Sequence, residues 1–179
     1  MFYAVESRHA NFVSLLLENG ADVDLADKHG FSPLHIASMQ DEEEVAKLLL
    51  ENGCNINARD DDNRTPLFWA VYNDHPNIVK ILLESGSDFE LGDTENRSPL
   101  YWAASKGATH CLDLLIQKGA SVNVQSTSGG RPLHKAVYNS HPESVIMLLD
   151  AGANIEARDR NGATALHVSA RVGNPEVTS

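Results

Sequence analysis

The sequence predicts an all-α solenoid built from a short repeat, and three observations support that prediction. The heptapeptide AVYNDHP at 70–76 returns as AVYNSHP at 136–142, 66 residues later. A shift of half that distance, 33 residues, aligns five motifs without a gap: SPLHIA at 32, TPLFWA at 65, SPLYWA at 98, RPLHKA at 131 and TALHVS at 164. The same shift aligns Gly20, Gly53, Gly86, Gly119 and Gly152. A short period of this kind is typical of arrays in which each unit packs on its neighbours.

The first element of each repeat is a short helix that begins inside the aligned motif. In the copy at 60–92, the hydroxyl of Thr65 can cap free backbone amides, and Pro66 suits the first helical position. Leu67, Ala70 and Val71 then recur at helical spacing. The pattern breaks at 74–75, so this helix is expected to span about two turns.

The second element is a longer amphipathic helix followed by a link. Pro76 opens it, and Gly86 ends it because glycine accepts the left-handed conformation of a helix end. Its apolar stripe is formed by Ile78, Val79, Ile81, Leu82 and Leu83. The remainder, SDFELG and then DTEN, is expected to be an extended or hairpin link. One turn column holds residues that best accept positive φ: Gly30, Asn63, Asn96, Gly129 and Gly162.

Two such short helices cannot bury their apolar faces alone, so neighbouring copies must stack. A 33-residue period with a TPLHxA-type motif opening the first helix resembles the ankyrin repeat. The segments NGADVD, NGCNIN, SGSDFE, KGASVN and AGANIE resemble the hairpin segment of that family. The resemblance covers essentially the whole chain. It implies an ankyrin solenoid, with a helix-turn-helix and a β-hairpin or loop in each repeat.

The register predicts four complete and two partial repeats, and we expect the chain to be a fragment of a longer protein. The boundaries are a partial repeat at 1–26, repeats at 27–59, 60–92, 93–125 and 126–158, and a partial repeat at 159–179, in which Pro175 opens a second helix. His35, His134 and His167 hold the motif histidine, which in the family serves a structural hydrogen-bond network. Phe68 and Tyr101 replace it, which suggests an aromatic substitute there. Arg131 replaces the capping Ser or Thr, at a cost of about 1 kcal/mol.

No pattern of residues predicts an active site, a metal site or a cofactor site. Cys54 and Cys111 stand in columns of small or apolar residues, which favours core positions, and without a CxxC pair a zinc site or a disulfide is disfavoured. The DEEE run at 41–44 falls at the start of a second helix, where negative charge complements the helix dipole. There is no phosphate-binding glycine loop, HExxH motif or nucleophile elbow. We therefore expect a protein that is not an enzyme.

Charge and hydropathy narrow the range of partners. The formal net charge is −11, from 14 basic and 25 acidic residues, which opposes binding to nucleic acid and to anionic membrane surfaces. The apolar runs are too short for a membrane-spanning helix, so no membrane insertion is expected. The first residues lack the basic and apolar regions of a secretory signal. These features, with two cysteines at core positions, predict an intracellular, cytoplasmic location.

The resemblance implies a non-catalytic protein–protein interaction scaffold or adaptor. In the ankyrin family, the variable turns and the open face of the first helices line a concave groove that binds other proteins. The matching turn positions are Lys28, His29, Phe31, Asp61, Asp62, Arg64, Thr94, Glu95 and Arg97. On the first helices they are Met39, Gln40, Tyr72, Asn73, Ser105, Lys106, Tyr138, Asn139 and Arg171. The alternative is a regulatory or targeting segment of a larger enzyme, channel or toxin-like protein.

The repeated heptapeptide suggests two equivalent tyrosine contacts. With first helices roughly 8 to 10 Å apart, Tyr72 and Tyr138 would be separated by roughly 16 to 20 Å. An extended partner peptide would bridge them with about five or six residues. The competing explanation is that the two copies descend from a two-repeat duplication and kept Tyr-Asn by ancestry. Trp69 and Trp102, at equivalent positions, are expected to pack between repeats rather than to contact a ligand.

Overall fold

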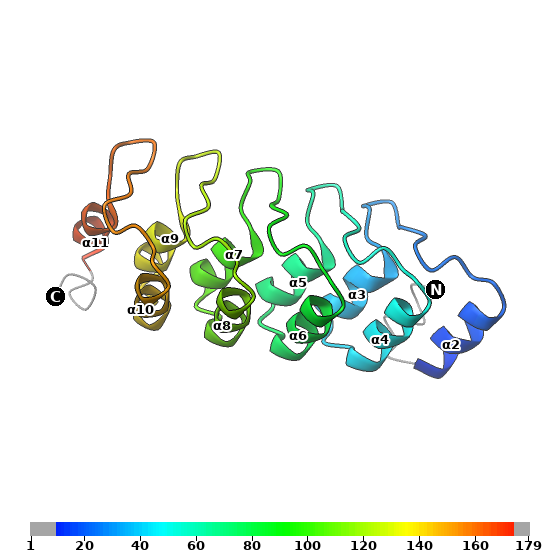
Figure 1. Ribbon diagram of the computed structural model, residues 1–179. Coiled ribbons are helices and arrows are strands. Elements are labelled where there is room, and N and C mark those ends of the chain that lie inside the picture. Colours follow the sequence, from blue (N-terminus) through cyan, green and yellow to red (C-terminus); the bar gives the residue numbers. More distant parts are fainter. Residues whose placement is uncertain (1–9, 174–179) are drawn as a thin grey trace. The chain divides into compact units, whose positions relative to one another are not determined.

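The computed structural model describes residues 10–173, which contain ten α-helices and no β-strand (Figure 1). The chain divides into two compact units, residues 1–88 and 89–179. The prediction of an all-α repeat solenoid is confirmed. The expected second helix after Pro175 lies outside the described residues.

The described part of the first unit, residues 10–88, contains five helices in two layers. These are α2 (Ala10–Glu18), α3 (Pro33–Met39), α4 (Glu43–Glu51), α5 (Pro66–Tyr72) and α6 (Pro76–Glu84). The first helices of the repeats, α3 and α5, pack side by side, and the second helices form the other layer as α2, α4 and α6 (Figure 1). Fully buried side chains fill the space between the layers: Val13, Leu34, Leu49, Leu67, Ile78 and Leu82.

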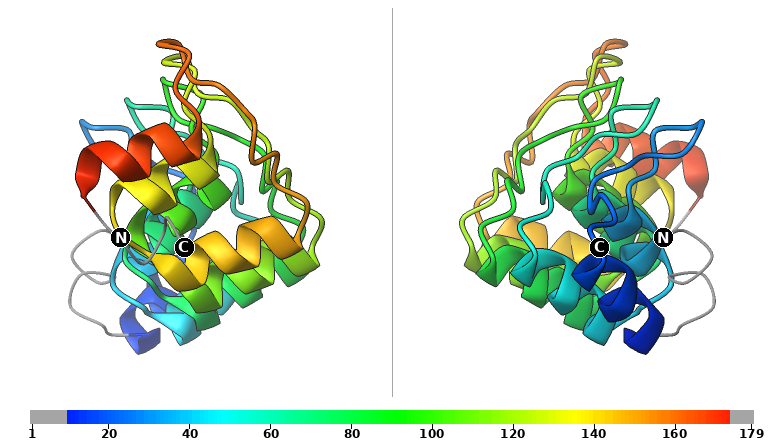
Figure 2. Two further views of the ribbon diagram at one scale, coloured as in Figure 1. Left: turned by 90° about the vertical axis from the view of Figure 1, so that its left-hand side faces the viewer. Right: turned by 90° about the vertical axis from the view of Figure 1, so that its right-hand side faces the viewer.

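The second unit repeats this arrangement. Its helices are α7 (Pro99–Lys106), α8 (Thr109–Gln117), α9 (Pro132–Tyr138), α10 (Pro142–Asp150) and α11 (Ala165–Val172). The first helices α7, α9 and α11 are packed in that order, and α8 packs against α10. Figure 2 shows the two rows of helices in the unit, with the links between repeats extending to one side of them. Its buried side chains include Leu100, Cys111, Leu112, Leu115 and Leu148.

Most first helices begin as the sequence predicts. Ser32, Thr65 and Ser98 are N-caps whose hydroxyls accept hydrogen bonds from backbone N–H groups three residues later, at 3.4, 3.2 and 3.3 Å. A proline follows each of them as the first helical residue. Arg131 precedes α9 without a side-chain cap. Its guanidinium donates instead to the carbonyl of Asn123.

The links between repeats are loops closed by a few backbone hydrogen bonds. In the copy at 60–92, the N–H of Asp60 donates to the carbonyl of Arg64 at 3.0 Å, and Asn63 between them has φ of 60°. All five residues of the predicted turn column have positive φ. Positive φ also occurs between the two helices of a repeat, at Asp41, Asp74 and Ser140, which the sequence pattern did not reveal.

The motif histidine bridges one repeat to the next. In His35, Nδ1 accepts from the N–H of Ser32 at 3.0 Å, so Nε2 carries the proton and donates to the carbonyl of Arg64 at 3.0 Å. His134 repeats the pattern, with Nε2 bonded to the carbonyl of Ala163 at 3.1 Å. Tyr101 fills the histidine column in its copy with a buried aromatic ring. Phe68 has no polar atom for such a bond.

Side-chain hydrogen bonds also connect each link to the next one. Residues 24, 57, 90 and 123 are equivalent positions in successive links, and a side-chain oxygen of each accepts a hydrogen bond from the backbone N–H that lies 31 residues later. The pairs are Asp24 with Asn55 (2.8 Å), Asn57 with Asp88 (2.9 Å), Glu90 with Ser121 (2.7 Å) and Asn123 with Asn154 (2.8 Å). These side chains therefore satisfy backbone N–H groups that strand pairing would satisfy in a hairpin.

Candidate protein-binding surface

The turn before α5 is held to its own helix by one carboxylate. Asp60 is 4% exposed, and its Oδ1 accepts from the N–H groups of Asp62 (3.0 Å) and Arg64 (2.9 Å). Its Oδ2 accepts from Arg64 Nε (2.9 Å) and from the indole N–H of Trp69 (3.0 Å). The guanidinium of Arg64 also lies over the indole, 4.4 Å from the ring centroid. Arg64 is thus engaged within its own repeat.

The turn before α7 is built in the same way. Asp93 Oδ2 accepts from Arg97 Nε (2.8 Å) and from the indole N–H of Trp102 (3.2 Å), and Arg97 lies 4.7 Å from that ring centroid. Trp69 also packs on Phe31 of the preceding repeat, with ring centroids 5.7 Å apart, as its predicted packing role requires. The guanidiniums of the predicted contacts Arg64 and Arg97 therefore hold turns together, although each side chain remains partly exposed.

The two tyrosines of the repeated heptapeptide have different surroundings. Tyr72 is half-buried and stacks on Phe68, with centroids 5.7 Å apart and planes at 15°, and it also meets Trp69 edge-on. Tyr138 is 54% exposed, with the ammonium of Lys135 5.1 Å from its ring centroid. Tyr138 is therefore the more accessible of the two, and they belong to different units.

The asparagine of the heptapeptide has a structural partner in both copies. Asn73 Nδ2 donates to the carbonyl of Met39 at 3.3 Å, and the ring of His75 bonds the same carbonyl at 3.1 Å. Asn139 Nδ2 donates to the carbonyl of Ser105 and to its hydroxyl, the latter at 3.0 Å. These bonds tie the end of one first helix to the preceding one. They explain why Asn recurs in both copies without any ligand.

The other predicted contact residues are distributed over the turns and helix ends. Phe31, Met39 and Gln40 are half-buried, and Ser105 is buried. The exposed ones are Lys28, His29, Asp61, Asp62, Thr94, Glu95, Lys106 and Arg171.

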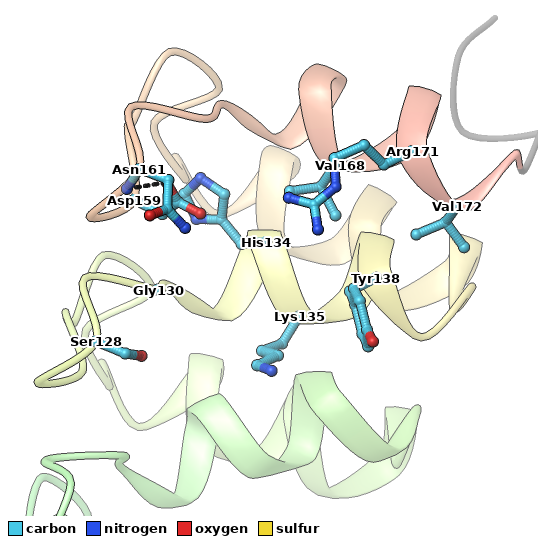
Figure 3. A pocket seen from close by; sticks show the side chains of 10 residues that line it. All are labelled: Ser128, Gly130, His134, Lys135, Tyr138, Asp159, Asn161, Val168, Arg171 and Val172. Carbon is cyan, nitrogen blue, oxygen red and sulfur yellow. Dashed lines mark hydrogen bonds between the residues drawn. The ribbon is translucent and has the colours of Figure 1, made fainter.

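A hollow of about 640 Å³ opens in the second unit between α9, α11 and the turns that precede them (Figure 3). It brings together two predicted residues, Tyr138 and Arg171. Four further polar residues that line it were not selected from the sequence as contacts: Ser128, Lys135, Asp159 and Asn161. Lys135 was missed because it occupies the column of Trp69 and Trp102, which was expected to be structural. We call the exposed surface of the first helices and their preceding turns in one unit the first-helix face of that unit.

Comparison with protein families identifies the repeat. A family model described as ankyrin repeats (3 copies) matches residues 1–60, 67–159 and 126–179. The chain belongs to the ankyrin-repeat family. Ankyrin repeats are generally protein–protein interaction modules and are typically non-catalytic. No curated protein matches the chain as a relative. The number of repeats in this ankyrin array and their boundaries stay predictions.

The acidic character of this ankyrin chain resides almost entirely in its first unit. Residues 1–88 hold 16 acidic and 6 basic residues, a formal charge of −10. Residues 89–179 hold 9 acidic and 8 basic residues, a charge of −1. The first-helix faces differ too: α3 and α5 contain no charged residue, whereas α7, α9 and α11 carry Lys106, Lys135 and Arg171. The first helices of the second unit are therefore cationic, although the chain as a whole is acidic.

In the described residues, the positions of metal-ligating and nucleophilic side chains bear on metal binding and thiol reactivity. No group of three His, Cys, Asp or Glu side chains within 10–173 is placed to hold a metal ion. Cys111 is buried as predicted, whereas Cys54 is only half-buried. Burial, with the nearby charge of Asp24, raises the pKa of the Cys54 thiol to about 11, so it is protonated at neutral pH. Among the described helices, none is long and apolar enough to span a membrane.

Proposed function

We propose that this ankyrin-repeat chain is a non-catalytic scaffold or adaptor that binds a segment of another protein on the first-helix face of its second unit. The observation that supports this most directly is the hollow between α9 and α11, because two of the predicted contact residues, Tyr138 and Arg171, line it. Its lining combines an exposed tyrosine, two long cationic side chains and small polar groups.

This composition suits protein recognition rather than catalysis. Tyrosine and arginine are enriched among the residues that dominate binding energy at interfaces. Tyr138 offers an aromatic surface at low entropic cost, because its ring already rests against Lys135. Ser128 and Asn161, on two successive turns, add hydrogen-bonding groups at the edge of the hollow. Cys54 and Cys111 form no disulfide bond, which suits a reducing compartment, and we propose that the chain acts inside the cell.

The test is quantitative affinity purification from a lysate of the source cells, followed by mass spectrometry. The parent chain is compared with a Tyr138→Ala, Arg171→Ala variant and with a Lys80→Ala, Lys118→Ala control on the second-helix layer. We expect the first variant to lose about tenfold of at least one specific partner, and the control to lose none. Circular dichroism establishes that all three chains keep the same helix content. If the first variant retains the same partners as the parent chain, the first-helix face of the second unit is not the binding surface.

Tyr72 is a poorer first target, although the sequence pairs it with Tyr138. Because its ring stacks on Phe68 and meets Trp69, its removal disturbs an aromatic cluster as well as any contact surface. Tyr138→Ala removes an exposed ring whose one ring contact among the described residues is with Lys135.

A further inference from the structure

The first helices of the second unit each carry one cation and no acid. Lys106 lies in the last turn of α7, Lys135 lies on α9 and Arg171 lies in the last turn of α11. None of these three helices contains Asp or Glu, although the chain has 25 acidic residues against 14 basic ones. The acidic residues of this unit that the structure describes lie instead on the second helices and in the links. These three cations on successive first helices form a local concentration of positive charge in an acidic chain, and such a concentration favours an anionic ligand.

The two cations beside the hollow lack carboxylate partners in the described part of the chain. The ammonium of Lys135 lies over the ring of Tyr138, and Arg171 is exposed on α11. Asp159 is the one acidic residue in the lining of the hollow. Its Oδ1 accepts from the N–H groups of Asn161 (2.8 Å) and Ala163 (2.9 Å), so it caps its own turn. By contrast, Arg64 and Arg97 each pair with a carboxylate of their own turn.

We propose that the hollow binds an extended acidic peptide segment of the partner, and this proposal rests on the proposed function above. One carboxylate pairs with Lys135 and a second with Arg171, whose guanidinium can hold it through two parallel hydrogen bonds. Neighbouring helices lie roughly 8 to 10 Å apart, so the two acidic residues are about two positions apart in an extended chain, where alternate side chains point to the same side. An apolar or aromatic residue two positions beyond one of them packs on Tyr138.

Charge complementarity favours a peptide over the two other anionic occupants. A nucleic acid would bring a dense row of phosphates toward a chain of formal charge −11, and the cationic set holds only three side chains. A second copy would have to place the acidic first unit, whose turn residues Asp61 and Asp62 are exposed, on this hollow. A short acidic segment delivers the same carboxylates with less repulsion from the rest of the molecule.

The test is selection from a random peptide display library on the complete chain, repeated with a Lys135→Glu, Arg171→Glu variant. A Lys80→Glu, Lys118→Glu variant carries the same charge change on the second-helix layer and serves as the control. We expect peptides selected by the parent and the control to be enriched in Asp and Glu. Synthetic peptides of the enriched sequences are then titrated by fluorescence anisotropy, and the first variant should bind them at least about tenfold more weakly. Raising NaCl from about 50 to about 300 mM should weaken binding to the parent.

The outcomes separate this inference from the proposed function. Peptides without acidic enrichment that still lose affinity with Tyr138→Ala would overturn the acidic partner and keep the peptide-binding surface. Peptides unaffected by either change, or no enriched peptide, would overturn both. If a labelled single-stranded oligonucleotide binds the chain more tightly than the selected peptides do, the ligand of the hollow is a nucleic acid and the acidic-peptide proposal is wrong. Self-association in sedimentation that the Lys135→Glu, Arg171→Glu variant abolishes would identify a second copy as the occupant.

Discussion

At the scale of single residues, the stability of this chain depends on polar side chains that each satisfy several backbone groups. Asp60 accepts four hydrogen bonds with one carboxylate, from two amides, a guanidinium and an indole. It is 4% exposed, so a group left without its partner there would not be compensated by water. Such residues are more sensitive to substitution than their exposed neighbours in the same turn.

Asp60→Asn should destabilise the chain by about 2 kcal/mol. The amide can keep one oxygen toward the turn, but it then directs an NH₂ group at Arg64 Nε and Trp69 Nε1, which are both donors. Asp61→Asn changes an exposed neighbour and should stay within about 0.5 kcal/mol of the parent. Urea unfolding followed by tryptophan fluorescence measures both. Equal stability of the two variants would show that the Asp60 bonds contribute little.

Protonation of His35 should make unfolding easier in mild acid. Burial lowers the pKa of its ring. Nδ1 now accepts a hydrogen bond from the N–H of Ser32, and a proton on Nδ1 would remove that acceptor and place two donors face to face. Because the folded-state pKa lies below the unfolded value of about 6.5, the contribution to stability is present above that pH and is lost as pH falls through the folded pKa.

The check is urea unfolding of the parent and of His35→Phe at about pH 7.5 and about pH 5. Phe68 occupies the same column, so a phenyl ring is compatible with the repeat. Carboxylate titration is common to both proteins, and the parent should lose more stability on acidification than the variant. Equal losses would remove His35 from the pH response.

Prediction from sequence was most complete where a residue acts within its own turn, and it missed several partners that lie a repeat away. The cap at Thr65 and the positive φ at Asn63 follow from local rules. The role of Asn73 depends on the Met39 carbonyl, 34 residues earlier, which no local pattern shows. The different exposure of the two tyrosines was accessible in principle, because aromatic residues precede Tyr72 where His and Lys precede Tyr138.

At the scale of elements, the start of α9 is the weakest of the four proline-led first-helix starts. Arg131 gives no side-chain cap, and its Nε is buried without a hydrogen-bond partner. Arg131→Ser should therefore stabilise the chain by about 1 kcal/mol. Serine supplies the missing acceptor, and the backbone N–H of residue 131 can still donate to His134 Nδ1.

Urea unfolding of Arg131→Ser and of a reference variant, Thr65→Ala, tests that expectation. Thr65→Ala removes a working cap and should lose about 1 kcal/mol, which calibrates the effect in the same fold. A neutral or destabilised Arg131→Ser would mean that the guanidinium bond to the Asn123 carbonyl outweighs the cap.

The links between helices were less predictable than the helices themselves. Period and caps located each helix start, because apolar spacing and proline placement are local signals. The links could be strands or loops on sequence alone, and in the described residues they are loops. Side-chain bridges such as Asp24 to the N–H of Asn55 take the place of a longer backbone ladder.

At the scale of the whole molecule, net charge divides the chain into two electrostatically different units. The first unit carries −10 and the second −1. Self-repulsion in a unit of high net charge opposes its compact state. Its exposed ion pairs act in the opposite sense, but Lys47 with Glu43 (3.8 Å) and Lys80 with Glu84 (4.0 Å) are exposed pairs worth about 0.5 kcal/mol or less each. Repulsion should therefore dominate the salt response of the first unit.

Raising NaCl from about 20 to about 300 mM should stabilise the first unit more than the second, because the screening length falls from roughly 20 Å to roughly 6 Å. Hydrogen exchange read by mass spectrometry resolves the units, and amides of α4 and α6 should gain more protection than those of α8 and α10. A Glu44→Gln, Asp61→Asn variant lowers the negative charge of the first unit at two exposed positions and should show a smaller response. If both units gain equal protection, salt is acting through general burial of apolar surface. A response confined to the first unit and reduced in the variant identifies repulsion among its carboxylates as the cause.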